Sequence, residues 1–219
     1  MVLKTNKWQK ALDVFLKNSY ESLSEVNHEW SIIGSIATKL QGCDLIPNDV
    51  DILVKEPKTV HFLSNLMTDF YDDSKRESLL NETPDNLWLS TKEQPVVESK
   101  DEWGFDWVFA RWIIHNTKVE VAHLTAPEGM KEKWESIWEA GPDIWTYIRK
   151  ISYGEYSLPV VPLEIQLGTS FSRGFDDRIA KIIQVLKEKG YNDDLLKTAL
   201  GEKRYKKTNE LLVNKKKEG

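Results

Sequence analysis

The chain has 219 residues, and 40% of them are hydrophobic, which is enough to bury the core of one large domain or of two small ones. Its 30 Lys and Arg against 35 Asp and Glu give a formal net charge of -5, so overall charge gives no reason to bind nucleic acid or an anionic membrane. The single cysteine, Cys43, excludes an internal disulfide, and no segment resembles a secretory signal or a membrane span. We expect a cytoplasmic protein without a membrane partner.

Helices and strands are expected to alternate in the first half of the chain. Apolar residues recur at helical spacing from Trp8 onward, and short apolar runs bounded by polar residues predict strands. The polar "HNT" separates two such runs and indicates a hairpin. The expected elements are a helix over 8–26, a strand over 30–33, a helix over 36–40, a strand over 49–54, a helix beginning near 57–59 and running to 70, and a hairpin of strands 107–114 and 118–124.

The second half is expected to be mostly helical. The strongest pattern lies over 176–189, where Asp176 or Asp177 can cap a helix that Gly190 ends. Two earlier helices are predicted from residues at helical spacing, which are Met130, Trp134, Ile137 and Trp138 for one, and Ile144, Ile148 and Ile151 for the other. The chain therefore divides at residue 125 into a mixed part, 1–125, and a helical part, 126–219.

Two aspartates interrupt the apolar run "DVDILV" at alternate positions. Successive side chains of a strand point to opposite faces, so Asp49 and Asp51 share one face while Val50, Ile52 and Val54 share the other. Two carboxylates held side by side favour a positive charge between them. A divalent cation such as Mg²⁺, which prefers oxygen ligands, suits this pattern.

A Gly-Ser pair lies between the first expected strand and the helix that follows it. The first turn of a helix has unpaired backbone N–H groups and a positive dipole end, so Gly34 and Ser35 can bind the phosphates of a nucleotide. The hairpin supplies a third acid, because Glu120 lies between Val119 and Val121 in the run "KVEVAHL".

The order of these features resembles the nucleotidyltransferase fold of the DNA polymerase beta type. In chain order they are an apolar strand, Gly-Ser, thirteen further residues, Asp-Val-Asp-Ile and a later acid on a strand. Within this superfamily the short chain is similar to small bacterial aminoglycoside and lincosamide nucleotidyltransferases, and to minimal nucleotidyltransferases. The resemblance covers roughly residues 30 to 125 by motif. It implies an α+β fold with a central mixed β-sheet flanked by helices, a catalytic domain over 1–125 and a helical C-terminal region over 126–219.

The resemblance also implies roles for individual residues. Gly34 and Ser35 would bind the triphosphate, and Asp49, Asp51 and Glu120 would be the catalytic carboxylates that hold two Mg²⁺ ions. Four basic residues are candidates to neutralise the triphosphate, namely Arg111, Arg173, Arg178 and Lys181, although a charge beside an apolar helical stripe is usually solvated. Trp103, Trp107 and Trp112 lie near the hairpin, where an aromatic ring can stack on a substrate or form part of the core.

Each residue has a simpler structural interpretation. Asp49 can be a turn residue after Pro47, Gly34 can serve a tight turn, Ser35 can cap a helix, and Glu120 can face solvent on a hairpin. The four histidines have no metal-ligand spacing.

These observations lead to one functional hypothesis and two alternatives. The hypothesis is Mg²⁺-dependent transfer of a nucleoside monophosphate from an NTP, with ATP as one candidate, to a hydroxyl of a small molecule, with an antibiotic as one candidate acceptor. The alternatives are an inactive nucleotide-binding or protein-interaction module of the toxin and antitoxin type, and a nucleotidyltransferase acting on protein or RNA. The RNA alternative depends on a lysine-rich end, namely Lys203, Lys206, Lys207, Lys215, Lys216 and Lys217.

Overall fold

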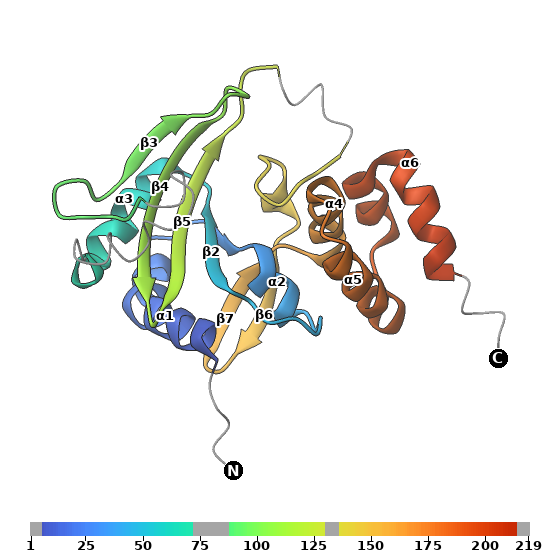
Figure 1. Cartoon of the computed structure of the whole chain (residues 1–219), viewed down its shortest axis with the longest axis horizontal. Coiled ribbons are helices and arrows are strands. Elements are labelled where there is room, and N and C mark those ends of the chain that lie inside the picture. The colour runs from blue at the N-terminus through green and yellow to red at the C-terminus, as the bar shows by residue number, and fades with distance from the viewer. Residues whose placement is uncertain (1–5, 72–87, 130–135, 214–219) are drawn as a thin grey trace, which may run out of the picture. The chain divides into compact units, whose positions relative to one another are not determined.

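A computed structural model describes residues 6–71, 88–129 and 136–213 (Figure 1). Its residue contacts divide the chain into two compact units, each of which is described by itself. Unit 1 consists of Met1–Trp30 and Pro47–Pro127, and unit 2 consists of Ser31–Ile46 and Glu128–Gly219. Residues 31–46 thus belong with the C-terminal part of the chain.

Unit 1 is a four-stranded mixed sheet with two helices. Its strands are hydrogen-bonded in the order β3-β4-β5-β2, in which β2 and β5 run parallel and the other pairs run antiparallel. The elements in chain order are α1 (Lys7–Glu25), β2 (Asp49–Val54), α3 (Pro57–Leu66), the 3₁₀ turn η1 (Thr68–Phe70), β3 (Val97–Lys100), β4 (Asp106–Ile114) and β5 (Thr117–Thr125).

Both helices of unit 1 pack against the same side of its sheet (Figure 1). Val50, Trp112, Val119 and Val121 are buried there, at alternate positions of β2, β4 and β5. The residues between them point to the other face of the sheet, because side chains alternate along a strand. The acids of β2 and β5 therefore lie on the face that α1 and α3 do not cover.

The turn between β4 and β5 fixes the register of this face. His115 and Asn116 both adopt positive φ, at 51° and 57°, which is typical of a two-residue type I′ hairpin turn. Ile114 therefore pairs with Thr117, and counting back along both strands pairs Arg111 with Glu120.

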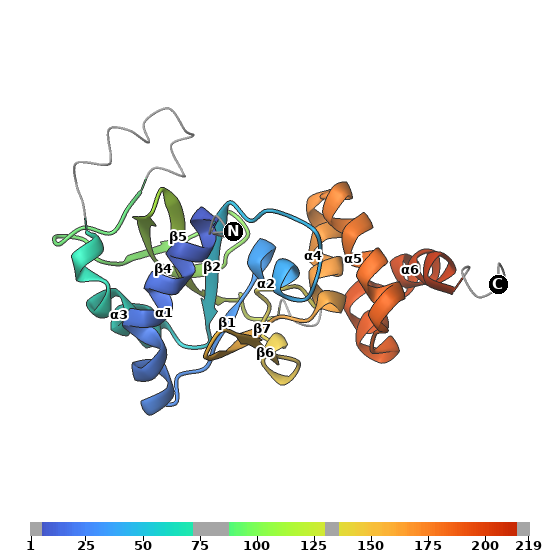
Figure 2. The same ribbon diagram turned by 90° about the horizontal axis from the view of Figure 1, so that it is seen from below.

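Unit 2 combines a small mixed sheet with a group of helices, α4, α5 and α6 (Figure 2). Strand β1 (Trp30–Ile32) pairs in parallel with β7, and β7 forms an antiparallel hairpin with β6. The other elements are α2 (Gly34–Leu40), the 3₁₀ turn η6 (Ile144–Thr146), β6 (Arg149–Tyr153), β7 (Tyr156–Val160), α4 (Leu163–Arg173), α5 (Asp176–Lys189) and α6 (Asp193–Val213), which kinks at Gly201.

The helices of unit 2 enclose a hydrophobic core. Leu167 of α4, Ile182 and Leu186 of α5, and Leu196 of α6 are buried in it together with Cys43. Asp176 and Asp177 occupy the first turn of α5, and Gly190 ends that helix with φ of 83°. The predicted helix over 176–189 is thus confirmed with both of its ends.

The fold class predicted from the sequence is confirmed, and so are the elements expected before residue 125, with one exception. The helix expected to run to residue 70 ends at Leu66, and Thr68–Phe70 form the 3₁₀ turn η1. The helix predicted through Ile144, Ile148 and Ile151 is wrong, because residues 144–146 form a 3₁₀ turn and Ile151 lies on β6. Pairing with β7 overrides the local helical spacing at this point. Met130 and Trp134 lie outside the described residues, and Ile137 and Trp138 lie outside any helix.

Among the described residues after 125, the α-helices begin at Leu163, after the η6 turn and the β6–β7 hairpin. The division at residue 125 follows from the sequence motifs and stays a prediction. The two units defined by residue contacts have other boundaries. Of the helices in the described part of the chain, none combines the length and the apolar character needed to cross a membrane.

Candidate active site

A row of charged residues crosses three strands of unit 1. On the parallel pair β2 and β5, Asp49 lies opposite Lys118 and Asp51 lies opposite Glu120. On the antiparallel pair β4 and β5, Arg111 lies opposite Glu120. Neighbouring strands are about 4.8 Å apart, so these five side chains start within a short distance of one another. We call them the charged row.

Arg111 and Glu120 form a mostly buried ion pair within the charged row. Arg111 Nε donates to Glu120 Oε2 at 2.6 Å, and a second guanidinium nitrogen contacts the same oxygen. The arginine side chain is 9% exposed and the glutamate side chain 20%. Each charge therefore compensates the other where water is largely excluded.

Other groups hold the guanidinium of Arg111 in place. Its Nη1 lies 3.5 Å from the carbonyl oxygen of Trp88, and its central carbon lies 5.3 Å from the centroid of the Phe109 ring. The backbone N–H of Arg111 donates to Ser90 Oγ at 3.0 Å. Arg111, which was predicted to bind the triphosphate, therefore lies beside Glu120, the third predicted acid.

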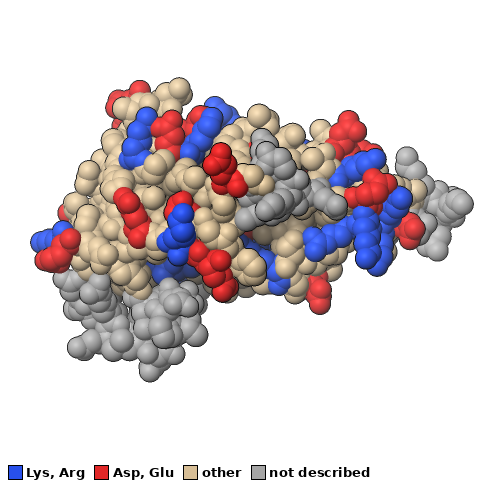
Figure 3. Space-filling view, turned by 90° about the horizontal axis from the view of Figure 1, so that it is seen from above, with Lys and Arg blue, Asp and Glu red and all other residues tan. Residues whose placement is uncertain are grey.

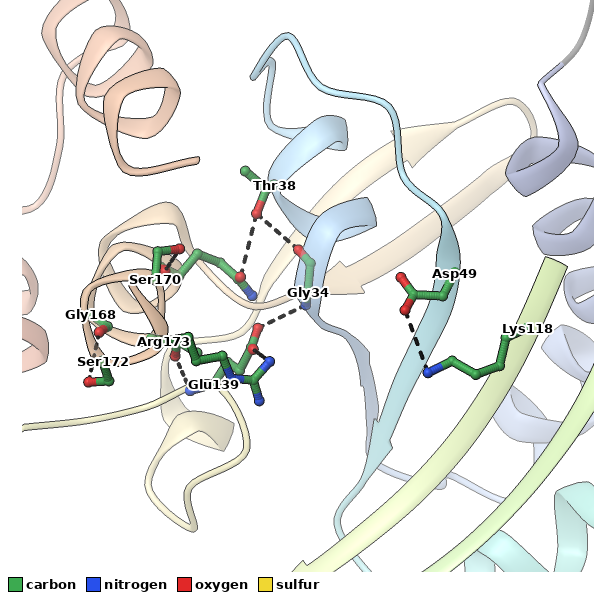
Figure 4. A network of polar contacts seen from close by, with 11 residues as sticks. Gly34, Thr38, Asp49, Lys118, Glu139, Gly168, Ser170, Ser172 and Arg173 are labelled. Atoms are coloured by element: carbon green, nitrogen blue, oxygen red, sulfur yellow. Dashed lines mark hydrogen bonds and ion pairs between the residues drawn. The ribbon is translucent and has the colours of Figure 1, made fainter. Parts of the chain in front are cut away.

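Asp49 also has a cationic neighbour. Lys118 Nζ lies 3.6 Å from Asp49 Oδ2, and both side chains are about one third exposed (Figure 4). Asp49 and Asp51 are both partly exposed, whereas Val50 and Ile52 are buried. The expected alternation on β2 is present, and Lys118 is a member of the charged row that the sequence reasoning missed.

The Gly-Ser pair belongs to unit 2. Gly34 opens α2 with φ of 64°, a left-handed conformation that favours glycine. Its backbone N–H donates to Glu139 Oε2 at 2.8 Å (Figure 4). A carboxylate of the chain itself is therefore bound by the N–H group that was predicted to meet a phosphate.

Glu139 is held firmly at this turn. Its side chain is 1% exposed, and its backbone N–H donates to Thr169 Oγ1 of α4 at 2.9 Å. Its second carboxylate oxygen lies 3.4 Å from Arg173 Nη1 and has no hydrogen bond among the residues that the structure describes. No sequence pattern indicates a functional role for Glu139, which lies between Trp138 and Ala140 outside any recognised motif.

Helix α2 is tied to α4 by polar contacts next to this turn. Thr38 Oγ1 donates to the carbonyl oxygen of Gly34 at 2.9 Å and lies 3.4 Å from Gln166 Oε1 (Figure 4). Gln41 contacts the carbonyl of Val161 and the N–H of Leu163. The position of Gly34 relative to α4 is thus fixed by side chains as well as by packing.

Three predicted cationic residues lie in unit 2. Arg173 contacts Glu139, whereas Arg178 lies over the Phe175 ring at 4.8 Å. Lys181 pairs with Asp177 at 2.6 Å, one helical turn away. Among these three, Arg173 alone reaches the contacts around Gly34 in the described part of the chain.

The tryptophans near the hairpin have different environments. Trp112 is buried in the core of unit 1, and Trp107 Nε1 donates to Asp101 Oδ2 at 2.9 Å. Trp103 is 70% exposed on the loop between β3 and β4. Burial removes Trp112 from the residues that can stack on a substrate.

The carboxylates of the charged row have the oxygen chemistry that Mg²⁺ prefers. Asp49 and Asp51 are partly exposed on one face of one strand, so they fit such an ion as a pair. Glu120 is turned to Arg111, and within the described residues no three His, Cys, Asp or Glu side chains come together as a metal-binding group. The fit is therefore good for the two aspartates and incomplete for the third acid.

No family model and no curated protein matches this chain. It resembles a solved structure from Thermotoga maritima described as a "putative nucleotidyltransferase", with 20% sequence identity and a TM-score of 0.51. The alignment covers 82% of this chain and 94% of that one. At this identity the likeness establishes a shared fold, namely the mixed α/β fold that the sequence predicted.

Proposed function

We propose that this chain is a Mg²⁺-dependent nucleotidyltransferase that transfers a nucleoside monophosphate from an NTP to a hydroxyl group. The proposal depends on one observation above all: Asp51 and Glu120 lie in register on β2 and β5, with Asp49 two residues before Asp51 on the same face. The fold shared with the Thermotoga maritima protein, which is described as a "putative nucleotidyltransferase", supports it.

Asp49 and Asp51 are the proposed ligands of the magnesium ion. When bound, the ion supplies positive charge to the phosphate oxygens and to the departing pyrophosphate. Both aspartates are partly exposed, and Lys118 beside Asp49 adds a further positive charge. These residues position charge and form no covalent bond with the substrate.

Gly34 and Ser35 are the proposed triphosphate ligands. A phosphate oxygen at Gly34 would take the hydrogen bond that Glu139 now accepts, so binding there exchanges one anionic acceptor for another. Arg173, which faces the same carboxylate, is the basic side chain best placed to follow either anion. Arg111, Arg178 and Lys181 already have local partners, so their proposed contribution is weaker.

Glu120 is the proposed acceptor of the proton from the attacking hydroxyl. The acceptor oxygen forms a bond to the α-phosphorus, the bond from that phosphorus to the bridging oxygen breaks, and pyrophosphate leaves. The hydroxyl proton passes to the carboxylate of Glu120. Proton transfer to a positioned side chain contributes typically about 10²–10⁴-fold to a rate.

A small acceptor fits the charges better than a polyanion. Basic side chains gather over the helices of unit 2 in the view of Figure 3, and acidic side chains lie among them. On α6, Lys197 and Lys206 both pair with Glu202. Residues 215–217 of the lysine-rich end lie outside the described residues. The acids Asp101, Glu102 and Asp106, which precede or begin β4, favour an acceptor that carries positive charge, as several antibiotics do.

The second candidate is a protein of this fold without transfer activity. Two contacts favour it, because Gly34 N–H is bound by Glu139 and Glu120 is bound by Arg111. Such a protein would bind an NTP without releasing pyrophosphate.

Pyrophosphate release separates the two candidates. Each NTP is incubated with Mg²⁺ and a panel of aminoglycosides, lincosamides, proteins and tRNA, and the wild type is compared with Asp51→Asn. Release that needs both an acceptor and Asp51 supports the transferase. NTP binding without release by any combination supports the inactive module, and turnover with tRNA alone would overturn the small-molecule acceptor.

A further inference from the structure

The Arg111–Glu120 pair limits how many cations the charged row can take. Its acids are Asp49, Asp51 and Glu120, and its bases are Arg111 and Lys118, so the row carries a net charge of -1. Without a nucleotide, one divalent ion would bring the net charge of the row to +1, and two ions would bring it to +3. The charge of the row therefore favours one ion over two in the absence of nucleotide.

Several contacts hold Glu120 and Arg111 together as an ion pair. Two guanidinium nitrogens contact the same glutamate oxygen, and the arginine is 9% exposed. The Trp88 carbonyl and the Phe109 ring hold the guanidinium from other sides. If Glu120 turned away to bind a cation, a buried guanidinium would lose its counter-charge, which is strongly unfavourable.

A second ion next to Glu120 would also lie near the charge of Arg111. Arg111 lies directly opposite Glu120 on the neighbouring strand, and arginine does not lose its proton in proteins. Like charges at short range in a partly buried place repel strongly, because the effective dielectric there is low.

We infer that Arg111 is a positioning residue that keeps Glu120 out of the coordination of the metal. In the absence of nucleotide, the charged row then binds one divalent cation, through Asp49 and Asp51. This inference rests on the proposed function, because the aspartates must bind a cation for the number of cations to matter. Glu120 remains available beside the ion as a separate carboxylate.

The experiment counts Mn²⁺ ions bound to the full chain in the absence of nucleotide, by electron paramagnetic resonance of free Mn²⁺ and by calorimetry. The wild type is expected to bind one Mn²⁺, and Asp51→Asn is expected to weaken this binding at least about tenfold. Two ions of similar affinity on the wild type would overturn the inference while supporting a metal site. The absence of any Mn²⁺ binding that depends on Asp51 would instead overturn the metal site of the proposed function, and the inference with it.

A double variant tests the role of Glu120 without leaving a buried charge alone. Arg111→Met together with Glu120→Gln removes both charges, and Mn²⁺ affinity should stay within about threefold of the wild type. A loss of tenfold or more would mean that Glu120 is a ligand. Arg111→Met alone releases Glu120, so a folded single variant should bind Mn²⁺ at least about tenfold more tightly or bind a second ion.

An exposed ion pair of the same unit provides the matched control. Lys55 and Glu29 lie 2.6 Å apart outside the charged row. Lys55→Met together with Glu29→Gln removes the same charges as the test variant, and it should bind Mn²⁺ as the wild type does. A loss of tenfold or more in the test variant together with an unchanged control would assign the loss to Glu120 and overturn the inference.

Discussion

The backbone N–H of Gly34 donates a 2.8 Å hydrogen bond to the carboxylate of Glu139, which lies 105 residues further along the chain. This carboxylate is buried and faces Arg173. Gly34 has a φ of 64°, a left-handed conformation that favours glycine. The carboxylate of Glu139 therefore occupies the position at Gly34 N–H where a phosphate of the NTP is proposed to bind.

Removing the charge of Glu139 should strengthen nucleotide binding. Glu139→Gln keeps an oxygen that can accept from Gly34 N–H, so the turn should retain its shape, but the repulsion between the carboxylate and a triphosphate is lost. We expect NTP affinity to rise at least about fivefold, or about 1 kcal/mol, as measured by calorimetry.

The control for this prediction is Glu164→Gln. Glu164 is an equally buried carboxylate of unit 2 that accepts from Arg149 and from the N–H of Asn192, away from Gly34. Its substitution should leave NTP affinity unchanged in a folded protein. Unchanged or weaker binding by Glu139→Gln would mean that Glu139 braces the turn and does not compete with the nucleotide.

Glu120 should affect the chemical step more than binding. Because Glu120→Gln alone would leave Arg111 buried without a counter-charge, at a cost of about 3–5 kcal/mol, the informative protein is Arg111→Met with Glu120→Gln. We expect it to bind NTP nearly normally and to transfer at least about 100-fold more slowly, the low end of what a general base contributes. Single-turnover transfer beside calorimetry measures both quantities. Unchanged transfer would show that Glu120 is not the base.

Gly168 is required for the close approach of α4 and α6. A Cβ atom at this position would lie 2.5 Å from the carbonyl oxygen of Ala199 and 3.4 Å from that of Ile137. Because both are backbone atoms, relief requires a helix to move, and Gly168→Ala should destabilise the protein by about 1–3 kcal/mol. Thermal unfolding should show a midpoint lower by about 2–4 °C for each kcal/mol, while Lys187→Ala, at an exposed position of α5, should have a negligible effect. Equal midpoints for the two variants would contradict this packing.

Cys43 should be a poorly reactive thiol. Burial raises the pKa of its thiol from 9.0 to about 11, although Lys189 and Lys39 act in the opposite direction. At pH 8 the thiolate fraction is then about one in a thousand, against about one in ten for the ordinary value, so alkylation of the native protein should be about 100-fold slower than that of the denatured protein.

The same shift makes a prediction about stability. The folded state holds the thiol proton more tightly than the unfolded state does. The contribution of Cys43 to the free energy of unfolding is therefore fully present below pH 9 and is lost as the pH rises to about 11. Unfolding of Cys43→Ser should lack this part of the alkaline loss. Rapid alkylation of the native protein at pH 8 would contradict the burial of Cys43.

Local sequence patterns predicted much of unit 1, because buried apolar residues alternate with polar residues along its strands. The acids of β2 could be assigned to one face from spacing alone, and a two-residue turn at His115 and Asn116 fixes Arg111 opposite Glu120. This second relationship could have been predicted from the sequence by counting back from the turn. The predicted strands 107–114 and 118–124 leave three residues for the turn, whereas Thr117 belongs to β5 and the turn has two.

The contacts of unit 2 depend on segments far apart in the sequence. Nothing near Glu139 indicates that it meets Gly34, and Ile144, Ile148 and Ile151 have helical spacing although Ile151 lies on β6. The parallel pairing of β1 with β7 joins Ile32 to Val160, and β6 follows as the partner of β7. Local periodicity contains no information about such pairings.

The transfer of label from two differently labelled nucleotides tests the central claim most directly. The protein is incubated with Mg²⁺, an acceptor that supports pyrophosphate release, and an NTP labelled either at the α-phosphate or at the γ-phosphate. Nucleotidyl transfer predicts that the α-label appears on the acceptor and the γ-label in pyrophosphate, and that Asp51→Asn abolishes both signals. Appearance of the γ-label on the acceptor, or of neither label in any product while the NTP remains bound, would contradict the proposed function.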